Sequence, residues 1–258
     1  MESMEANAVT VYLFFKGSEL DLSEKKLNSY LEKEWPNSPA MHELRKKSDQ
    51  HSFVFGDETL GTLTTSKSSY PWEELEIRCQ TAWWWEEAET SLKGHKSHAV
   101  ITLFNDQVDP VVLSTHLTAL TCALIKVTKP IAVLWGNGEV LHSAETFLEI
   151  AELSREEDPS LPLSLWVDFQ LLFEEGEQQS LYSYGLESLG FPDLEIHSAK
   201  GDPSDLMTAI QSIAIYMVGN NIEFQDDETI GLEGDKPIRL HYGESLLGEE
   251  REVLILEV

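Results

Sequence analysis

Hydrophobic and polar positions alternate with a period of two near the start of the chain. From Val9 to Phe15 every second residue is apolar and falls on one face, which predicts a strand with that face buried. The stretches Ser52–Phe55 and Leu60–Thr65 are separated by a short acidic turn and predict a hairpin. Ala99–Phe104 is almost continuously apolar, as expected for a strand that is covered on both faces.

Helix signals lie between these strands. Asp21, with Glu24 three residues later, forms a capping box and predicts a helix that continues to Pro36. The polar stretch Asn37–Asp49 is interpreted as a connection, and helix formers from Trp85 to Leu92 predict a second helix. The resulting order, β-α-β-β-α-β, is that of a ferredoxin-like unit.

The second half of the chain repeats this order with additional strands. Asp109 followed by Pro110 is a typical helix start, and leucines at helical spacing predict a long helix over about residues 109–127. The elements predicted after it are a strand Ile131–Trp135, a helix Ala144–Leu153, strands Leu163–Phe173 and Ser180–Tyr184, a helix from Asp202, and strands Thr229–Leu232, Ile238–Tyr242 and Val253–Val258. We therefore predict an α+β fold of two ferredoxin-like halves, residues 1–108 and 109–258, joined by the long helix and packed as helices over antiparallel or mixed sheets.

Charge distinguishes the two ends of the chain. The 258 residues hold 46 acids and 18 bases, a net charge of −28. Residues 1–138 carry 19 acids and 13 bases, whereas residues 139–258 carry 27 acids and five bases. Because so acidic a surface repels phosphate groups, we expect no nucleic-acid and no membrane binding, and we expect attraction to a basic partner protein. Solubility, or adaptation to a salty habitat, is the alternative explanation of the charge.

Targeting signals and cysteine content both indicate a cytoplasmic protein. Residues 1–8 hold two acids and no base, the reverse of the start of a secretory signal. We expect no membrane span, which would need about 18 consecutive apolar residues. Cys79 and Cys122 are the only cysteines and lie far apart in the sequence, which suits a reducing compartment.

Known catalytic signatures are largely missing from the sequence. The chain has no phosphate-binding loop, no zinc-protease helix motif and no serine nucleophile elbow. Gly136-Asn137-Gly138 resembles a dinucleotide loop only in its two glycines and is interpreted as a plain turn. His95 and His98 have a spacing that would suit one metal ion if a carboxylate joined them. Their alternative role is at a helix end, where histidines interact favourably with the helix dipole.

Two further features are candidates for a binding site. Trp83, Trp84 and Trp85 are consecutive, and in an extended segment at least one of them is hard to bury. They either pack in the core or line a recognition groove, because tryptophan is common in both. Asp168 lies inside an apolar strand pattern and is either a solvent-facing position or a buried carboxylate that needs partners.

Short motifs along the chain resemble a bacterial family known as domain of unknown function 4261. The resemblance runs from about Tyr70 to the C-terminus, and the family implies no established activity and no catalytic residues. The motifs that carry it are Pro71-Trp72-Glu73-Glu74-Leu75, Cys79–Trp85, His95–Ala99, Val133–Gly136, Leu165–Phe169, Gly185–Gly190 and the segment Asp202–Ile238.

These observations favour a non-enzymatic binding module that captures a basic partner, as immunity-type proteins do. We expect it to need no cofactor. The alternative is a metal-dependent hydrolase that uses His95 and His98 with a carboxylate such as Asp168. A structural role in an oligomer is a third possibility, which the sequence does not separate from the first.

Overall fold

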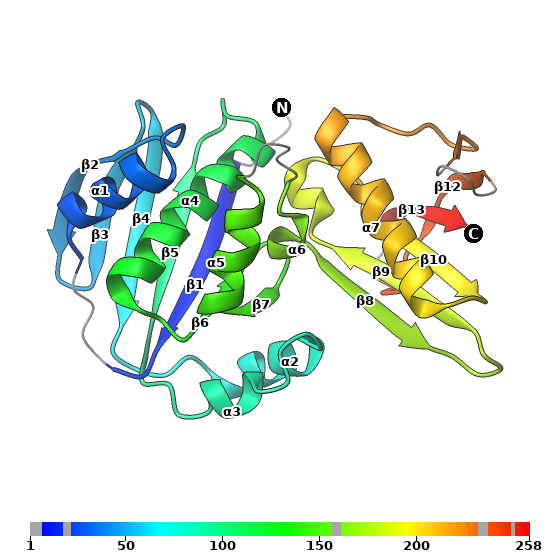
Figure 1. The fold of residues 1–258 in the computed structure, drawn as a ribbon, viewed down its shortest axis with the longest axis horizontal. Coiled ribbons are helices and arrows are strands. Elements are labelled where there is room, and N and C mark those ends of the chain that lie inside the picture. The colour runs from blue at the N-terminus through cyan, green and yellow to red at the C-terminus, as the bar shows by residue number, and fades with distance from the viewer. Residues whose placement is uncertain (1–6, 18–21, 156–160, 232–236, 249–250) are drawn as a thin grey trace. The chain divides into compact units, whose positions relative to one another are not determined.

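The chain divides into two compact units, Met1–Glu157 and Asp158–Val258, in a computed structural model (Figure 1). The structure describes residues 7–17, 22–155, 161–231, 237–248 and 251–258. Helices make up 34% of the chain and strands 33%, in two separate sheets, so the predicted α+β class is confirmed. Each unit is described in turn below.

The first unit is a seven-stranded antiparallel sheet with helices. Its strands lie in the order β2-β3-β4-β5-β1-β6-β7. In chain order its elements are β1 (Ala8–Phe15), α1 (Glu24–Glu34), β2 (Met41–Lys47), β3 (Gln50–Phe55), β4 (Thr59–Ser66), α2 (Trp72–Thr81), α3 (Ala88–Leu92), β5 (Ser97–Phe104), α4 (Pro110–Thr128), β6 (Ala132–Trp135), β7 (Val140–Ser143) and α5 (Ala144–Leu153).

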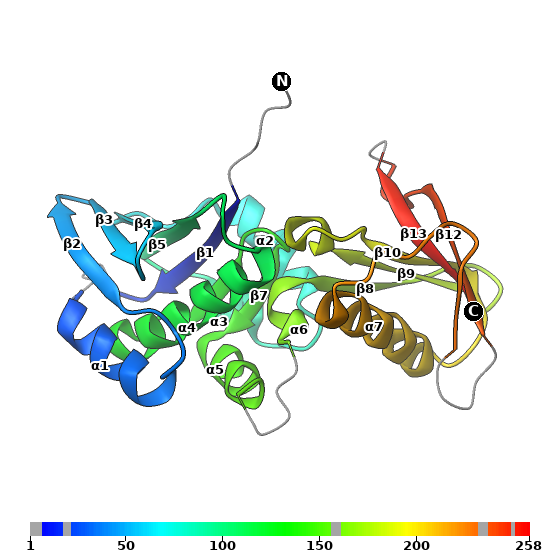
Figure 2. The same cartoon turned by 90° about the horizontal axis from the view of Figure 1, so that it is seen from above.

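The period-two pattern of β1 correctly predicts its two faces. Val11 and Leu13 are fully buried on the face covered by α4, and Figure 2 shows α1, α4 and α5 on that side of the strands. Among the described residues, α4 is the one helix that is long and apolar enough to suit a membrane span. No membrane span was predicted from the sequence. The packing of α4 against β1, α1 and α5 accounts for this composition, because α4 is buried on nearly every side.

The opposite face of the sheet is partly covered by α2 and α3. Phe14, on the other side of β1 from Leu13, packs with Leu75 of α2 and Leu92 of α3 in one apolar cluster. The predicted helix Trp85–Leu92 is shorter than expected, since α3 starts only at Ala88, and α2 precedes it where no element was predicted. The tryptophan run occupies the turn between these two helices.

The connection predicted at Asn37–Asp49 contains an edge strand, β2, that pairs only with β3. The Asn28 side chain holds β2 against α1 by bonding both the N–H and the C=O of Met41, at 2.8 and 2.7 Å. Lysine-rich polar strands are typical of sheet edges, where charge discourages pairing with another chain. The polar composition of this segment therefore reflects an exposed edge of the sheet.

The start of α1 also differs from the prediction. Asp21 lies outside the described residues, and the N-cap is Ser23, whose hydroxyl accepts from the Lys26 N–H. Glu24 does not fold back as in a capping box, because its carboxylate accepts from the Leu44 N–H of β2 at 3.1 Å. Glu24 is thus a second link between α1 and β2.

The second unit is a mixed six-stranded sheet with a long helix on one face (Figure 2). Its strand order is β11-β12-β13-β10-β9-β8, and only β10 and β13 are parallel. The elements are α6 (Leu163–Trp166), β8 (Asp168–Phe173), β9 (Gln179–Tyr184), the 3-10 turn η1 (Leu186–Leu189), β10 (Leu194–Ala199), α7 (Pro203–Asn220), β11 (Thr229–Ile230), β12 (Ile238–Glu244) and β13 (Glu252–Glu257).

The boundary between the units lies about 50 residues after the predicted one at 108/109. The helix that was expected to join two halves is α4, which belongs to the core of the first unit because it covers β1. The strands β2, β7 and β10 were not predicted. The strand predicted at Leu163–Phe173 begins with the short helix α6, and Leu232 lies outside the described residues.

Candidate functional site

The three consecutive tryptophans differ in exposure. Trp83 is 64% exposed, whereas Trp84 and Trp85 are partly buried against the apolar cluster of α2, α3, β6 and β7. The Trp84 indole N–H donates to the Leu141 carbonyl at 3.1 Å, which fixes its ring beside that of His142. The sequence argument that at least one of the three stays exposed is therefore satisfied by Trp83.

Trp83 is held on a rigid base. Its ring meets the ring of Trp84 edge-on, with the centroids 5.5 Å apart. The turn around it is closed by two backbone hydrogen bonds of 2.9 Å, from Trp83 to Thr81 and from Trp85 to Ala82. The exposed indole is thus preorganised, which reduces the entropy lost if a partner binds it.

Carboxylates dominate the surface next to Trp83. Glutamates occupy six positions between residues 73 and 89: Glu73, Glu74, Glu76, Glu86, Glu87 and Glu89. The bases in this neighbourhood are already paired, Arg78 with Glu139 at 2.5 Å and Lys93 with Glu89 at 3.3 Å. The segment therefore presents a negative surface with a large aromatic side chain in it.

His95 has a structural role in this region. It is buried, its Nδ1 donates to the Leu92 carbonyl at 2.9 Å, and its Nε2 accepts from the Tyr70 N–H at 2.7 Å. Both ring nitrogens are used, so no lone pair remains for a metal ion. His95 connects the end of α3 to the loop that leads into α2.

His98 lies on β5, close to the same loop. Its Nδ1 lies 3.1 Å from the Ser68 carbonyl, and its ring meets that of Tyr70 edge-on. Burial lowers the pKa of His98 below its usual value, although the Ser68 carbonyl partly opposes this. Burial, together with the Glu74 carboxylate, raises the pKa of Tyr70 to about 12.

Asp168 belongs to the other unit and opens β8. It is buried, and its Oδ1 accepts from the Gln170 side-chain amide at 2.7 Å. The hydrolase alternative thus combines histidines of one unit with a carboxylate of the other. Within the described part of the chain, no group of three or more His, Cys, Asp and Glu side chains is arranged to hold a metal ion.

The second unit contains a buried polar network that sequence reasoning missed. The Asp193 carboxylate is only 1% exposed and accepts from the Ser183 hydroxyl, the Gly185 and Leu186 amides and the Arg251 guanidinium. Burial raises the pKa of Asp193 above its usual value, and the four donors lower it part of the way back. Asp193 thereby holds the start of the turn η1 and the start of β13 together.

Arg251 completes this part of the network. Its guanidinium lies 2.5 Å from Asp193 and 3.2 Å from Glu187, and it stacks over the Tyr184 ring at 5.0 Å. Burial by itself would lower the pKa of Arg251, but the two carboxylates raise it above its usual value.

Glu195 anchors the turn between β12 and β13. Its carboxylate, also 1% exposed, accepts from the Ser245 hydroxyl at 2.6 Å and the Leu246 N–H at 2.9 Å, and it pairs with His197 at 2.7 Å. In a catalytic triad the histidine lies between the serine and the carboxylate, whereas here the carboxylate lies between serine and histidine. The arrangement is that of a structural clamp. Its sequence signal is the alternation of charged and apolar residues from Asp193 to His197.

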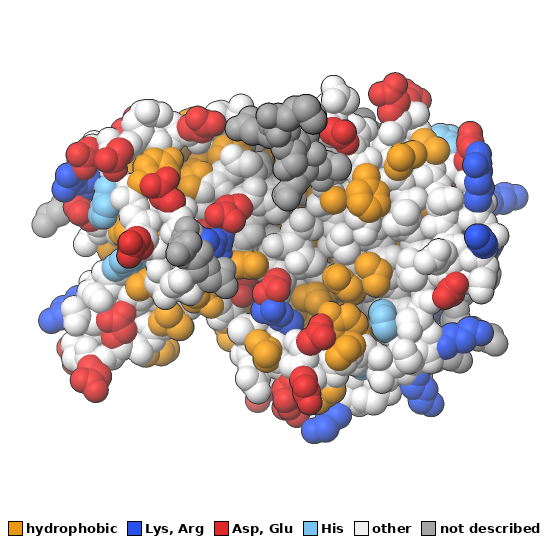
Figure 3. All heavy atoms as spheres, turned by 180° about the vertical axis from the view of Figure 1, so that it is seen from behind, with side chains coloured by type: hydrophobic (Ala, Val, Ile, Leu, Met, Phe, Trp, Pro, Cys, Tyr) orange, Lys and Arg blue, Asp and Glu red, His pale blue; other side chains and the backbone are white. Residues whose placement is uncertain are grey.

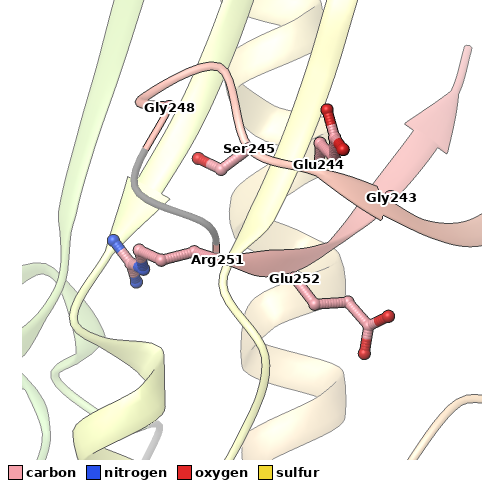
Figure 4. A pocket seen from close by; sticks show the side chains of 6 residues that line it. All are labelled: Gly243, Glu244, Ser245, Gly248, Arg251 and Glu252. Carbon is pink, nitrogen blue, oxygen red and sulfur yellow. The ribbon is translucent and has the colours of Figure 1, made fainter.

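A cavity of about 420 Å³ adjoins this clamp. Figure 4 shows Ser245 and Arg251, both already bonded within the network, at its wall. Glu244 and Glu252 face each other directly across the β12–β13 ladder, where like charges destabilise the pairing. The residues that line the cavity are Gly243, Glu244, Ser245, Gly248, Arg251 and Glu252.

The comparison with known families identifies one segment of the chain. Residues 182–257 match the model of a domain of unknown function, DUF4261. This confirms the resemblance to that family for the part of the chain that holds Asp193, Glu195 and Arg251; the remainder of the resembling stretch, from Tyr70 to residue 181, lies outside the match. No curated protein and no solved structure matches the chain.

Proposed function

We propose that the protein is a cytoplasmic binding module that captures a basic partner protein. The observation that carries this proposal is the charge of the second unit. Residues 158–258 contain 21 acids and four bases, a net charge of −17. A field of this strength attracts cationic proteins and speeds their association.

The arrangement of the few bases supports the proposal. Arg251 is bonded to buried Asp193, and Arg239 is paired with Asp227 and Glu257. Cationic side chains of the first unit instead gather along one edge, on the side of α1 and β2 (Figure 3). The acidic surface of the second unit is therefore little offset by its own bases.

The state of the buried polar groups favours binding over turnover. Asp193 and Glu195 are fully engaged with donors that fix loops, and His95 has both nitrogens in use. These contacts support structural roles for the groups that would otherwise be the first candidates for acid–base chemistry.

The proposal is tested by affinity capture followed by titration with the purified captured protein. Three exposed acids of the second unit are neutralised together, E175Q/E177Q/E223Q. The matched control neutralises three exposed acids of the first unit, E32Q/E145Q/E149Q, and so carries the same total charge. We expect the second-unit triple to weaken binding more than the control triple, in a salt-sensitive way. Equal weakening by both triples, or no captured basic protein even at low salt, would overturn the proposal.

A further inference from the structure

The segment from α2 through α3, residues 72–92, exposes large apolar side chains although it has a well-filled core. Trp83 is 64% exposed and Ile77 is 54% exposed. In the same segment Leu75, Ala82 and Leu92 are fully buried, so the exposure does not come from a lack of apolar partners. Tryptophan is one of the residues that are enriched in binding hot spots.

The carboxylates around these two residues define what can dock there. Glu73 and Glu74 lie four and three residues before Ile77 on α2, a spacing that places them on the same helix face. Glu86 and Glu87 lie three and four residues after Trp83 and are exposed. An apolar group of a partner that docks here must therefore be accompanied by positive charge.

The local bases do not cancel this requirement. Arg78 is bound to Glu139, and Lys93 pairs with Glu89 and lies over the Trp72 ring. An anionic partner would meet uncompensated carboxylates, whereas Lys and Arg would find both ion-pair acceptors and an exposed indole face, which binds cations.

We infer that Trp83, Ile77, Glu73, Glu86 and Glu87 form a docking surface, here called the tryptophan surface, for a partner segment with an apolar side chain flanked by Lys or Arg. This inference rests on the proposed function and specifies it, because it assigns the apolar anchor of the basic partner to the first unit. The acidic second unit then contributes long-range attraction, and the tryptophan surface contributes short-range recognition.

Three synthetic peptides provide the test, titrated calorimetrically into the full-length protein. The first alternates Lys with Leu, the second replaces every Leu with Ser and so keeps the charge, and the third replaces every Lys with Gln and so keeps the apolar residues. We expect the Lys/Leu peptide to bind most tightly, and Trp83→Ala to weaken its binding by about tenfold or more. The Lys/Ser peptide should bind weakly, and Trp83→Ala should change its affinity much less than that of the Lys/Leu peptide.

Two matched controls make the result specific. Leu153→Ala removes an apolar side chain of similar exposure, 61%, elsewhere in the first unit and should leave binding unchanged. E73Q/E86Q/E87Q should weaken binding more than E32Q/E145Q/E149Q, which removes the same charge. Trp83→Phe, which keeps an aromatic anchor, should retain most of the affinity, and unchanged circular dichroism confirms the fold of each variant.

The outcomes separate this inference from the proposed function. If the Lys/Leu and Lys/Ser peptides bind equally well, or if Trp83→Ala binds like the wild type, the inference of docking at the tryptophan surface is wrong. The proposed capture of a basic partner by charge is not contradicted by that result. If neither Lys-containing peptide binds at low salt, both the tryptophan surface and the proposed function are wrong.

Discussion

Arg251 donates to Asp193 across 2.5 Å, although the two residues are 58 positions apart in the sequence. Asp193 is 1% exposed, and the Arg251 side chain is 14% exposed. The pair connects the start of β13 to the turn after β9, within the segment that matches the family model. Removing one partner of such a pair leaves the other charge buried without compensation, which costs more than the pair contributes when intact.

We therefore expect Arg251→Met to destabilise the protein by about 3 kcal/mol. The matched control is Arg239→Met, which breaks exposed ion pairs with Asp227 and Glu257 and should destabilise the protein far less, because solvent screens these pairs. Urea denaturation followed by circular dichroism measures both values. A loss for Arg251→Met no larger than that of the control would show that the buried network does not stabilise the second unit.

Gly61 on β4 leaves room for the ring of Phe53 on the neighbouring strand, β3. A Cβ added at Gly61 would lie 2.1 Å from the nearest ring atom, and these two residues are direct partners in the ladder. We expect Gly61→Ala to cost about 1–3 kcal/mol because the buried ring must move. The melting temperature reports this loss, and Phe53→Leu in the same chain should recover part of it. Gly17→Ala, where nothing lies within 4 Å, is the control.

The buried histidine His116 makes the first unit sensitive to acid. Burial lowers the pKa of His116 below 6.5, and its ring lies edge-on to Phe55. In the unfolded chain this histidine binds a proton at a higher pH than in the folded one, so stability falls as the pH drops below 6.5. We expect the melting temperature to decrease less steeply between about pH 6.5 and pH 5 in His116→Gln than in the wild type. Parallel curves for the two proteins in this range would contradict the expectation.

The cationic side chains of β2 protect an open sheet edge. β2 pairs only with β3 and carries Arg45, Lys46 and Lys47. We expect Arg45→Val with Lys47→Val to promote association, which light scattering detects, because the strand edge becomes apolar. The change also makes the net charge more negative, which by itself increases solubility. A variant that scatters no more light than the wild type would show that the edge needs no such protection.

The sequence predicts the helices and strands that bury one face or both faces of apolar residues. It does not predict the strands whose polar residues depend on partners far away in the sequence. The face of β1 and the stripe of α7 follow from periodicity alone, because each buries one regular set of apolar residues. β2 was missed because an edge strand needs few apolar residues. β10 was missed because Glu195, like Asp193 just before the strand, is buried only through a distant partner, and the partners Ser245 and Arg251 lie 50 and 58 residues away in the sequence.

The candidate site was predictable in part. Three adjacent indoles made one exposed tryptophan a reasonable expectation, but which one is exposed depends on the bond from Trp84 to Leu141, across 57 residues. The histidine pair was predicted as either a metal site or a helix end, and His95 in fact bonds the end of α3 and the loop that leads into α2. The predicted halves already separated Asp168 from His95 and His98, and the structure likewise places Asp168 in the second unit.

The most direct test of the proposed function is the dissociation constant of the captured basic protein, measured by calorimetry at about 0.1 M and about 1 M salt. Charges are screened much more strongly at the higher salt concentration. The account predicts binding that weakens at least tenfold at the higher salt concentration, and that weakens further at both concentrations in Trp83→Ala. A dissociation constant that is the same at both salt concentrations would contradict capture by the acidic surface.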